Sequence, residues 1–481
     1  MSQNDASKEK LDSDILKMAL ILVVGALAPL FDTTIVTVGI HTIGHDLQSS
    51  VSTTQWVTTG YLLALGIVVP ISGWILKRFG GKRTWMFALV LFLMGSMLSG
   101  LAWNMGSLIF FRVLQGIGGG LIMPTAQNLI VQAAGGEKLG RTIAVIGLPT
   151  VLGPILGPVL GGFIVHFLNW RWMFYVNVPI CLAALILAWL GLPKDKPEHH
   201  KNPFDLIGFV LISPALVAII YGLTQMGTSN HFLNTTATIY LAIGVLLLLI
   251  FIVYALKKAA NPIIDLRLFQ FRSFSIAFIL MFLSGLSLYG AMLILPLYFQ
   301  QVSGASVLMS GVLLIPQGIG SLLSRFLAGK LTDIIGGRLV AVVGIVMTAL
   351  GTLPFVLAGP HASYLFLAIA LIVRGAGLSS VMIPIMTTAY KGLSKEQIPH
   401  ASSTTRIIQQ IGGAFGAAVF AAILGNQLTH SSVINMSVEA SAFRYTFFWS
   451  LVFILPALIL AIFLPGNKSN TQLAHERTMR M

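Results

Sequence analysis

Fourteen stretches of about 20 mostly apolar residues divide this chain, and they restrict its fold more than any other feature. A helix needs about 20 apolar residues to cross the hydrocarbon layer of a membrane, and a helix satisfies its own backbone hydrogen bonds there. The sequence therefore predicts an all-α membrane protein with fourteen transmembrane helices. The stretches cover roughly residues 15–39, 55–76, 85–103, 107–131, 142–167, 172–192, 204–225, 236–256, 274–299, 307–329, 339–358, 364–390, 401–425 and 443–464.

The composition agrees with a membrane location and argues against nucleic-acid binding. Of the 481 residues, 56% are hydrophobic and 9% are charged, whereas about 25% of a soluble domain is charged. The net charge is +14, but the basic residues separate apolar stretches and form no compact basic face. We therefore expect a lipid bilayer, and no nucleic acid, as a partner.

The positions of lysine and arginine predict the orientation in the membrane. Cytoplasmic connections of membrane proteins carry an excess of these residues. Here 23 of the 29 lie at the termini or in alternate connections, and only Arg171 and Arg444 lie in the opposite set. The other four lie within the stretches. We therefore expect a multi-pass protein of the plasma or inner membrane with both termini in the cytoplasm.

The two ends of the chain repeat one another. Residues 73–83 (GWILKRFGGKR) resemble residues 329–338 (GKLTDIIGGR), and residues 115–124 (QGIGGGLIMP) resemble residues 374–384 (RGAGLSSVMIP). Two parallel six-helix halves that rock about a central site are typical of transporters. The repeat predicts an N-terminal half, a linker with two inserted helices, a C-terminal half and a cytoplasmic tail, at residues 1–192, 193–259, 260–464 and 465–481.

Five motifs together resemble the major facilitator superfamily, specifically its fourteen-span drug:proton antiporter branch. The resemblance covers nearly the whole chain and implies a secondary transporter that exports drugs in exchange for protons by alternating access, without a cofactor or metal. The motifs are FDTTIVTVGI (residues 31–40), GWILKRFGGKR (73–83), LIFFRVLQGIGGG (108–120), GPILGPVLGG (153–162) and WRWMFYVNVPI (170–180).

The two loop motifs differ from each other in charge. The family's usual aspartate is replaced by Lys77 in the first loop, whereas the second keeps Asp333. In the family this aspartate is a charge latch between helices that favours the outward-facing state, so the resemblance implies that role for Asp333 and leaves it in doubt for the first loop. The motif positions are Gly73, Lys77, Arg78, Gly80, Gly329, Asp333, Gly336 and Arg338.

The fifth apolar stretch carries glycines at intervals of four. Residues with this spacing share one face of a helix, and glycines there let another backbone approach closely, while the prolines bend the helix. We predict either a hinge-like contact between the halves or ordinary tight packing, and both can hold. The antiporter motif that the resemblance marks comprises Gly153, Pro154, Gly157, Pro158, Gly161 and Gly162.

Asp32 is the one acid, of fifteen, that lies deep within an apolar stretch. At 1.5 Å per residue, both Asp32 and Arg112 lie about 8 Å from the outer face of a hydrocarbon core of about 30 Å. Because an unpaired charge in the membrane is unfavourable, we predict that the two side chains pair. A proton and a cationic drug that compete for Asp32 would produce exchange, and a fixed structural ion pair is the alternative.

Several aromatic and polar side chains are candidates for a substrate pocket. Aromatic rings bind cations through their faces, which suits lipophilic cationic drugs, although aromatic residues in membrane helices also simply pack. Arg374 could bind a backbone carbonyl or an anionic group of a substrate. The candidates are Phe31, Trp56, Tyr61, Gln115, Met123, Tyr289, Tyr298 and Arg374.

The leading functional interpretation is proton-coupled multidrug efflux, including antibiotic efflux. Export of an endogenous metabolite or a lipid-like molecule is the alternative. A membrane-embedded enzyme or a sensor is disfavoured, because the sequence has no converging catalytic groups, no phosphate-binding loop and no sizeable soluble domain. Expected partners are small-molecule drugs, protons and, if the cell has an outer membrane, a periplasmic adaptor.

Overall fold

The structure, a computed structural model, describes residues 13–134, 139–195, 204–228, 235–257, 262–359, 362–394, 396–429 and 436–465. Within these ranges the regular structure is helical, without a strand. Residues 196–203, in the first part of the predicted linker, and almost all of the tail that follows residue 464 lie outside the described residues.

The helices follow the predicted apolar stretches closely. The first group comprises α1 (Ser13–Asp46), α2 (Val51–Phe79), α3 (Gly81–Gly100), α4 (Met105–Ala134), α5 (Leu139–Ile146), α6 (Leu148–Phe167), α7 (Trp172–Tyr175) and α8 (Asn177–Gly191). The inserted pair comprises α9 (Leu206–Thr228) and α10 (Thr235–Lys257). The last group comprises η1 (Leu266–Gln270), α11 (Arg272–Leu297), η2 (Tyr298–Val302), α12 (Val307–Leu313), α13 (Ile315–Ile335), α14 (Gly337–Leu357), α15 (Tyr364–Tyr390), α16 (Ile398–Thr429) and α17 (Met436–Ile462).

Thirteen helical segments of the described chain are long and apolar enough to cross a membrane. The remaining predicted stretch, residues 142–167, is divided at Gly147 into α5, of eight residues, and α6, of 20. Pro149 lies in the first turn of α6, where its missing amide hydrogen and fixed φ favour the start of a new helix. The total of fourteen spans stays a prediction.

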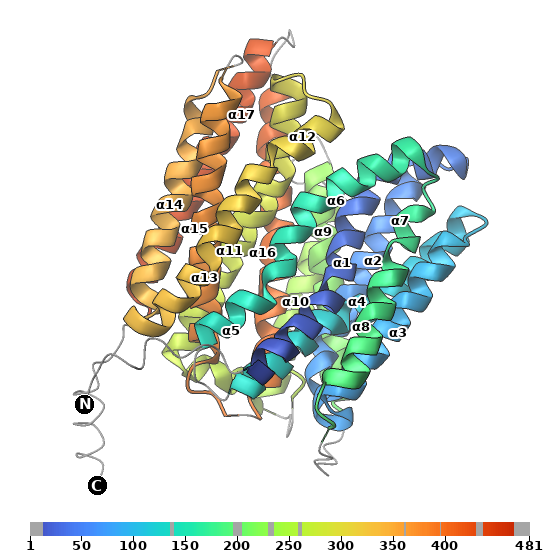
Figure 1. Cartoon of the computed structure of the whole chain (residues 1–481), viewed down its shortest axis with the longest axis vertical. Helices are drawn as coiled ribbons and strands as arrows, with labels where there is room; N and C mark the ends of the chain where they lie inside the picture. Colours follow the sequence, from blue (N-terminus) through green and yellow to red (C-terminus); the bar gives the residue numbers. More distant parts are fainter. Residues whose placement is uncertain are drawn as a thin grey trace.

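The helices gather in two bundles that stand side by side (Figure 1). Helices α1–α8 form the first bundle and α11–α17 form the second, and α5 reaches across to pack against α13. The inserted helices α9 and α10 pack against each other, and α9 also contacts α2 of the first bundle and α16 of the second. The inserted pair therefore bridges the two bundles.

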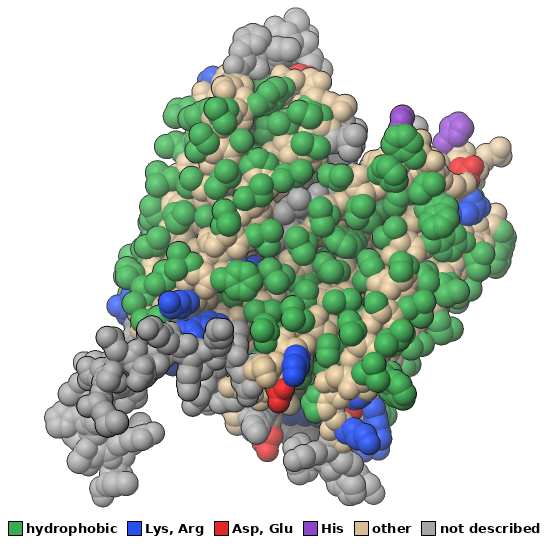
Figure 2. Space-filling model, viewed as in Figure 1, with side chains coloured by type: hydrophobic (Ala, Val, Ile, Leu, Met, Phe, Trp, Pro, Cys, Tyr) green, Lys and Arg blue, Asp and Glu red, His purple; other side chains and the backbone are tan. Residues whose placement is uncertain are grey.

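Lysine and arginine side chains gather toward one end of the molecule, and a broad apolar surface covers its flank (Figure 2). We call the end at which α1 begins and α2 ends the basic end, because Lys77, Arg78 and Lys82 lie there. Leu246 and Val253 of α10 are also more than half exposed. An apolar surface of this kind is stable against lipid tails but not against water, so the fold is that of a multi-pass membrane protein.

The two bundles repeat the same helix contacts. A Cβ atom on Gly95 of α3 would lie 2.6 Å from Cα of Gln115 on α4, and a Cβ atom on Gly351 of α14 would lie 2.6 Å from Cα of Arg374 on α15. Only glycine lets two helices approach this closely. In the second bundle, Arg374 therefore takes the position that Gln115 has in the first.

Candidate functional site

Asp32 and Arg112 form an ion pair inside the first bundle. The guanidinium Nη1 of Arg112, on α4, lies 2.5 Å from Oδ2 of Asp32, on α1. Neither side chain has any exposed surface. The two charges thus lie at one depth and in contact, as counting residues along the two helices predicts.

Two amides complete the environment of the Asp32 carboxylate. Gln115 Nε2 donates to Oδ1 at 2.8 Å, and Asn177 Nδ2 of α8 donates to the same oxygen at 3.1 Å. The Ser96 hydroxyl oxygen, on α3, accepts from both amides at 2.8 and 2.9 Å. Four helices therefore supply this network, and a proton on either carboxylate oxygen would displace one of the present donors.

The guanidinium of Arg112 also contacts α2. Its Nε donates to the Val57 carbonyl at 3.1 Å, and its Cζ lies 4.2 Å from the centroid of the Tyr61 ring. A cation over an aromatic face is favourable, more so where water is excluded. Three buried polar atoms of the network have no hydrogen-bond partner among the described residues: Nη2 of Arg112, Oη of Tyr61 and Oδ1 of Asn177. These atoms can therefore form further hydrogen bonds with one or more small polar molecules or groups.

The predicted pocket residues of the first bundle do not share one pocket. Tyr61 and Gln115 contact Arg112, and Phe31 and Met123 are buried in two different apolar clusters. Trp56 is 42% exposed and stacks on Tyr221 of α9, with ring centroids 6.0 Å apart.

The predicted pocket residues of the second bundle are also dispersed. Tyr298 is buried in a cluster of phenylalanine rings that includes Phe355 and Phe443, so it packs within the bundle. Tyr289 of α11 is half-buried against Gly413 of α16.

Arg374 is the buried cation of the second bundle. Its Nη1 donates to Oε1 of Gln317 at 2.8 Å, and its Nε donates to Oγ1 of Thr352 at 3.2 Å. These partners are neutral, and no carboxylate of the described residues lies within ion-pair distance of Arg374. The second bundle therefore repeats the helix packing of the first without its acid.

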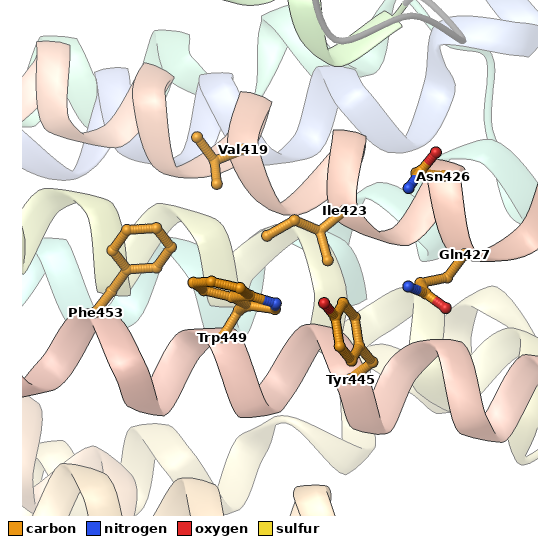
Figure 3. A pocket seen from close by; sticks show the side chains of 7 residues that line it. All are labelled: Val419, Ile423, Asn426, Gln427, Tyr445, Trp449 and Phe453. Carbon is orange, nitrogen blue, oxygen red and sulfur yellow. The ribbon is translucent and has the colours of Figure 1, made fainter.

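A pocket of about 290 Å³ lies between α16 and α17 (Figure 3). Its lining residues belong to the last part of α16 and the first two thirds of α17, away from the basic end. Three aromatic side chains of α17 form one wall, and two amides lie toward the end of α16. None of the predicted site residues lines it. Its lining residues are Val419, Ile423, Asn426, Gln427, Tyr445, Trp449 and Phe453.

Asp333 joins the two bundles at the basic end. Its carboxylate accepts hydrogen bonds from the backbone amides of Gly140, at 2.8 Å, and Arg141, at 3.2 Å, in the first turn of α5. An acid at a helix N-terminus is favourable because the helix dipole is positive there. The latch role that the family resemblance implies for this residue stays a prediction.

Lys77, which replaces the acid in the first loop, also contacts the opposite bundle. Its Nζ lies 2.9 Å from Nε2 of His400 on α16, while Nδ1 of His400 lies 2.9 Å from the Ile263 carbonyl. An ammonium group only donates, so Nε2 accepts and Nδ1 carries the proton. One turn earlier on α2, the Ser72 hydroxyl bonds the Ser403 hydroxyl at 2.8 Å.

The other loop-motif residues hold turns and helix contacts. Gly80 and Gly336 end α2 and α13 with φ of +88° and +90°, a conformation that strains other residues. Gly73 lies against the Pro399 carbonyl, Arg78 is exposed, and Arg338 donates to the Leu464 carbonyl within its own bundle at 2.7 Å.

Hydrogen bonds between the bundles concentrate toward the basic end. Among the described residues, the bonds that join α1–α8 to α11–α17 include Ser72–Ser403, Lys77–His400, Gln127–Tyr390, Asp333 with Gly140 and Arg141, and Arg325–Ala144. All of these lie on the half of the molecule nearer that end. The structure is therefore closed at its basic end.

Two repeated helical bundles, a lipid-exposed flank and a buried ion pair in one bundle define a membrane transporter with two parallel halves. The chain belongs to the Major Facilitator Superfamily, whose family model matches residues 21–417 and 277–477.

Curated relatives match this chain over most of its length. Over 429 residues, the chain is 37% identical to the multidrug resistance protein B homolog of Mycobacterium tuberculosis, covering 89% of this chain and 79% of that protein. Over 406 residues, it is 30% identical to the multidrug export protein EmrB of Haemophilus influenzae, covering 84% and 79%.

Solved structures share the fold at low identity. A double-tryptophan mutant of XylE aligns with a TM-score of 0.66 and 16% identity, over 96% of this chain and 98% of that one. The human organic anion transporter MFSD10 aligns with a TM-score of 0.62 and 15% identity, over 93% and 99%.

Two residues of the Asp32 network were not predicted as site residues. Asn177 lies in the quoted motif at residues 170–180, which singled out the segment but not this side chain. Ser96 has no sequence signal beyond being a polar residue in an apolar stretch. Gln115 was predicted to line a pocket, whereas here it bonds Asp32 and Arg112.

Proposed function

We propose that this protein is a proton-coupled multidrug efflux transporter that exports lipophilic or cationic compounds in exchange for protons. One observation carries the proposal: the single deeply embedded acid, Asp32, is held by a cation in the core of the first bundle. Ionisable groups inside a membrane are costly to retain and commonly mark proton or ion pathways. The multidrug names of two relatives support the substrate class.

The competitor of the proton at Asp32 is the guanidinium of Arg112. Asp32 has no exposed surface, so a drug does not contact it in this conformation. A proton on Oδ2 would neutralise the acid and release Nη1 of Arg112, whose Nε also bonds the Val57 carbonyl of α2. Proton binding would thus change the contacts between α1, α4 and α2.

Drug binding is proposed to occur between the bundles, near the membrane midplane, where two-half transporters commonly hold their substrates. Exchange then requires that an empty, charged site does not reorient freely. The basic end is placed in the cytoplasm because of its lysines and arginines. The closed basic end then corresponds to an outward-facing or occluded state.

The test uses the full chain in proteoliposomes and follows proton movement after a lipophilic cation such as ethidium is added. We expect the native protein to move protons and the variant Asp32→Asn to move none, because a side-chain amide binds no proton in the pH range of the assay. The matched control is Asp46→Asn, which changes the acid at the C-terminal end of the same helix, where Asp46 accepts a hydrogen bond from Trp170 near the surface. Drug-induced proton movement at the native rate in Asp32→Asn would end the assignment.

A further inference from the structure

The short helix α5 of the first bundle lies directly on α13 of the second. A Cβ atom on Gly140 would lie 2.5 Å from the Gly329 carbonyl oxygen, and one on Gly329 would lie 2.8 Å from the Gly140 carbonyl oxygen. Asp333, one turn further along α13, bonds the first turn of α5. The backbones are thus in mutual contact at the start of α5.

A second charge of α13 binds the other end of α5. Arg325 is 4% exposed, and its Nε donates to the Ala144 carbonyl at 2.5 Å. The last four carbonyls of a helix lack partners within it, and a cation is favourable there because the dipole is negative. With Asp333 at one end and Arg325 at the other, α13 binds each end of α5 with the charge that complements the dipole.

The guanidinium of Arg325 occupies the break between α5 and α6. A Cβ atom on Gly147, the residue between the two helices, would collide with Nη2 of Arg325. No carboxylate of the described residues lies within ion-pair distance of Arg325. The backbone at the break therefore stabilises this buried charge.

Beyond the break, α6 is packed on the helix that carries Asp32. The glycines Gly153, Gly157 and Gly161 face α1, and Thr34 Oγ1 donates to the Gly153 carbonyl at 3.1 Å. The glycine face thus makes the close packing predicted for it, but against α1 of its own bundle. The predicted contact between the halves is made by α5 and by other residues of α6.

We propose that Arg325 is a positioning residue for transport, which holds the break at Gly147 in the conformation that closes the basic end. It connects α13 of the second bundle, through the break and α6, to α1. When the basic end opens, Arg325 leaves the Ala144 carbonyl, and α6 is free to shift against α1. The consequence for proton exchange at Asp32 rests on the proposed function, whereas the role in closure does not.

The experiment measures exposure of the basic end in the full chain, in nanodiscs, with a water-soluble maleimide. Ser403→Cys serves as the reporter, because Ser403 is fully buried between the bundles at that end. The native Cys181 is fully buried inside the first bundle and reports general unfolding. Mass spectrometry of the two peptides separates their labelling rates.

We expect Arg325→Ala to raise the labelling rate of the reporter roughly tenfold, because it removes a buried hydrogen bond made by a charged donor. Cys181 should stay protected. Arg325→Lys keeps a cation without the planar fork and should give a smaller rise. Arg338→Ala is the matched control, since Arg338 also donates to a carbonyl but within its own bundle, and should leave the rate unchanged.

An unchanged reporter rate in Arg325→Ala, with Cys181 protected, overturns the proposal. Should the alanine variant expose Cys181 as well, Arg325→Lys decides in the same assay. A selective rise at the reporter supports the proposal, and no rise overturns it. Because no drug or proton gradient enters this assay, its outcome is independent of the result for Asp32→Asn.

Discussion

Replacing Arg112 alone should damage the protein more than replacing both members of its ion pair. Arg112→Met leaves the Asp32 carboxylate fully buried, with only the amides of Gln115 and Asn177 as donors. Removing one partner of a buried pair typically destabilises by about 3–5 kcal/mol. In the double variant, Asp32→Asn with Arg112→Met, no charge remains, and we expect the loss to fall to about 1–2 kcal/mol.

The assay is denaturant unfolding of the purified protein in mixed micelles, followed by tryptophan fluorescence, for the native chain, both single variants and the double variant. Equal destabilisation of the single variant Arg112→Met and of the double variant would refute the reasoning.

Other substitutions test the contacts between helices. His400→Arg places a permanent cation beside Lys77, so we expect faster labelling at the basic end in the maleimide assay, whereas His400→Gln, which keeps an acceptor, should change it little. Gly375→Ala would drive a methyl group into the Gln317 carbonyl and should lower stability by about 1–3 kcal/mol, measured by thermal unfolding. Gly359→Ala is its control, because no atom lies within 4 Å of the added Cβ, and a loss of stability there would contradict the packing argument.

The ion pair could be predicted from the sequence because three facts combine along two helices. The helix rise is constant, the apolar stretches fix where each helix enters the membrane, and Asp32 is the one acid at depth. Depth therefore selected Arg112 as its partner without any knowledge of helix packing. The alternation of basic connections and the internal repeat likewise predict an orientation and two parallel halves, since both depend only on the order of residues along the chain.

The amide network and the α5–α13 contact could not be predicted in the same way. Periodicity tells which residues share a helix face, but not which neighbouring helix that face meets. Asn177 reaches Asp32 only because α8 lies beside α1, and Arg325 reaches Ala144 only because α5 crosses to the other bundle. Tyr298 was assigned to a pocket on its chemistry alone, whereas its position in the second bundle makes it part of an aromatic core.

The inserted helices make the two flanks of the molecule different, and this difference affects access from the bilayer to the seam between the bundles. Since α9 contacts both α2 and α16, it separates the seam between the bundles from the bilayer on that flank. The other flank of the seam is formed by the contacts of α6 with α12 and α13, and we expect lipophilic compounds to move between bilayer and protein there. When the bundles tilt against each other, α9 must slide along α2, along α16 or along both. It is therefore a moving contact between the bundles as well as a barrier to lipid.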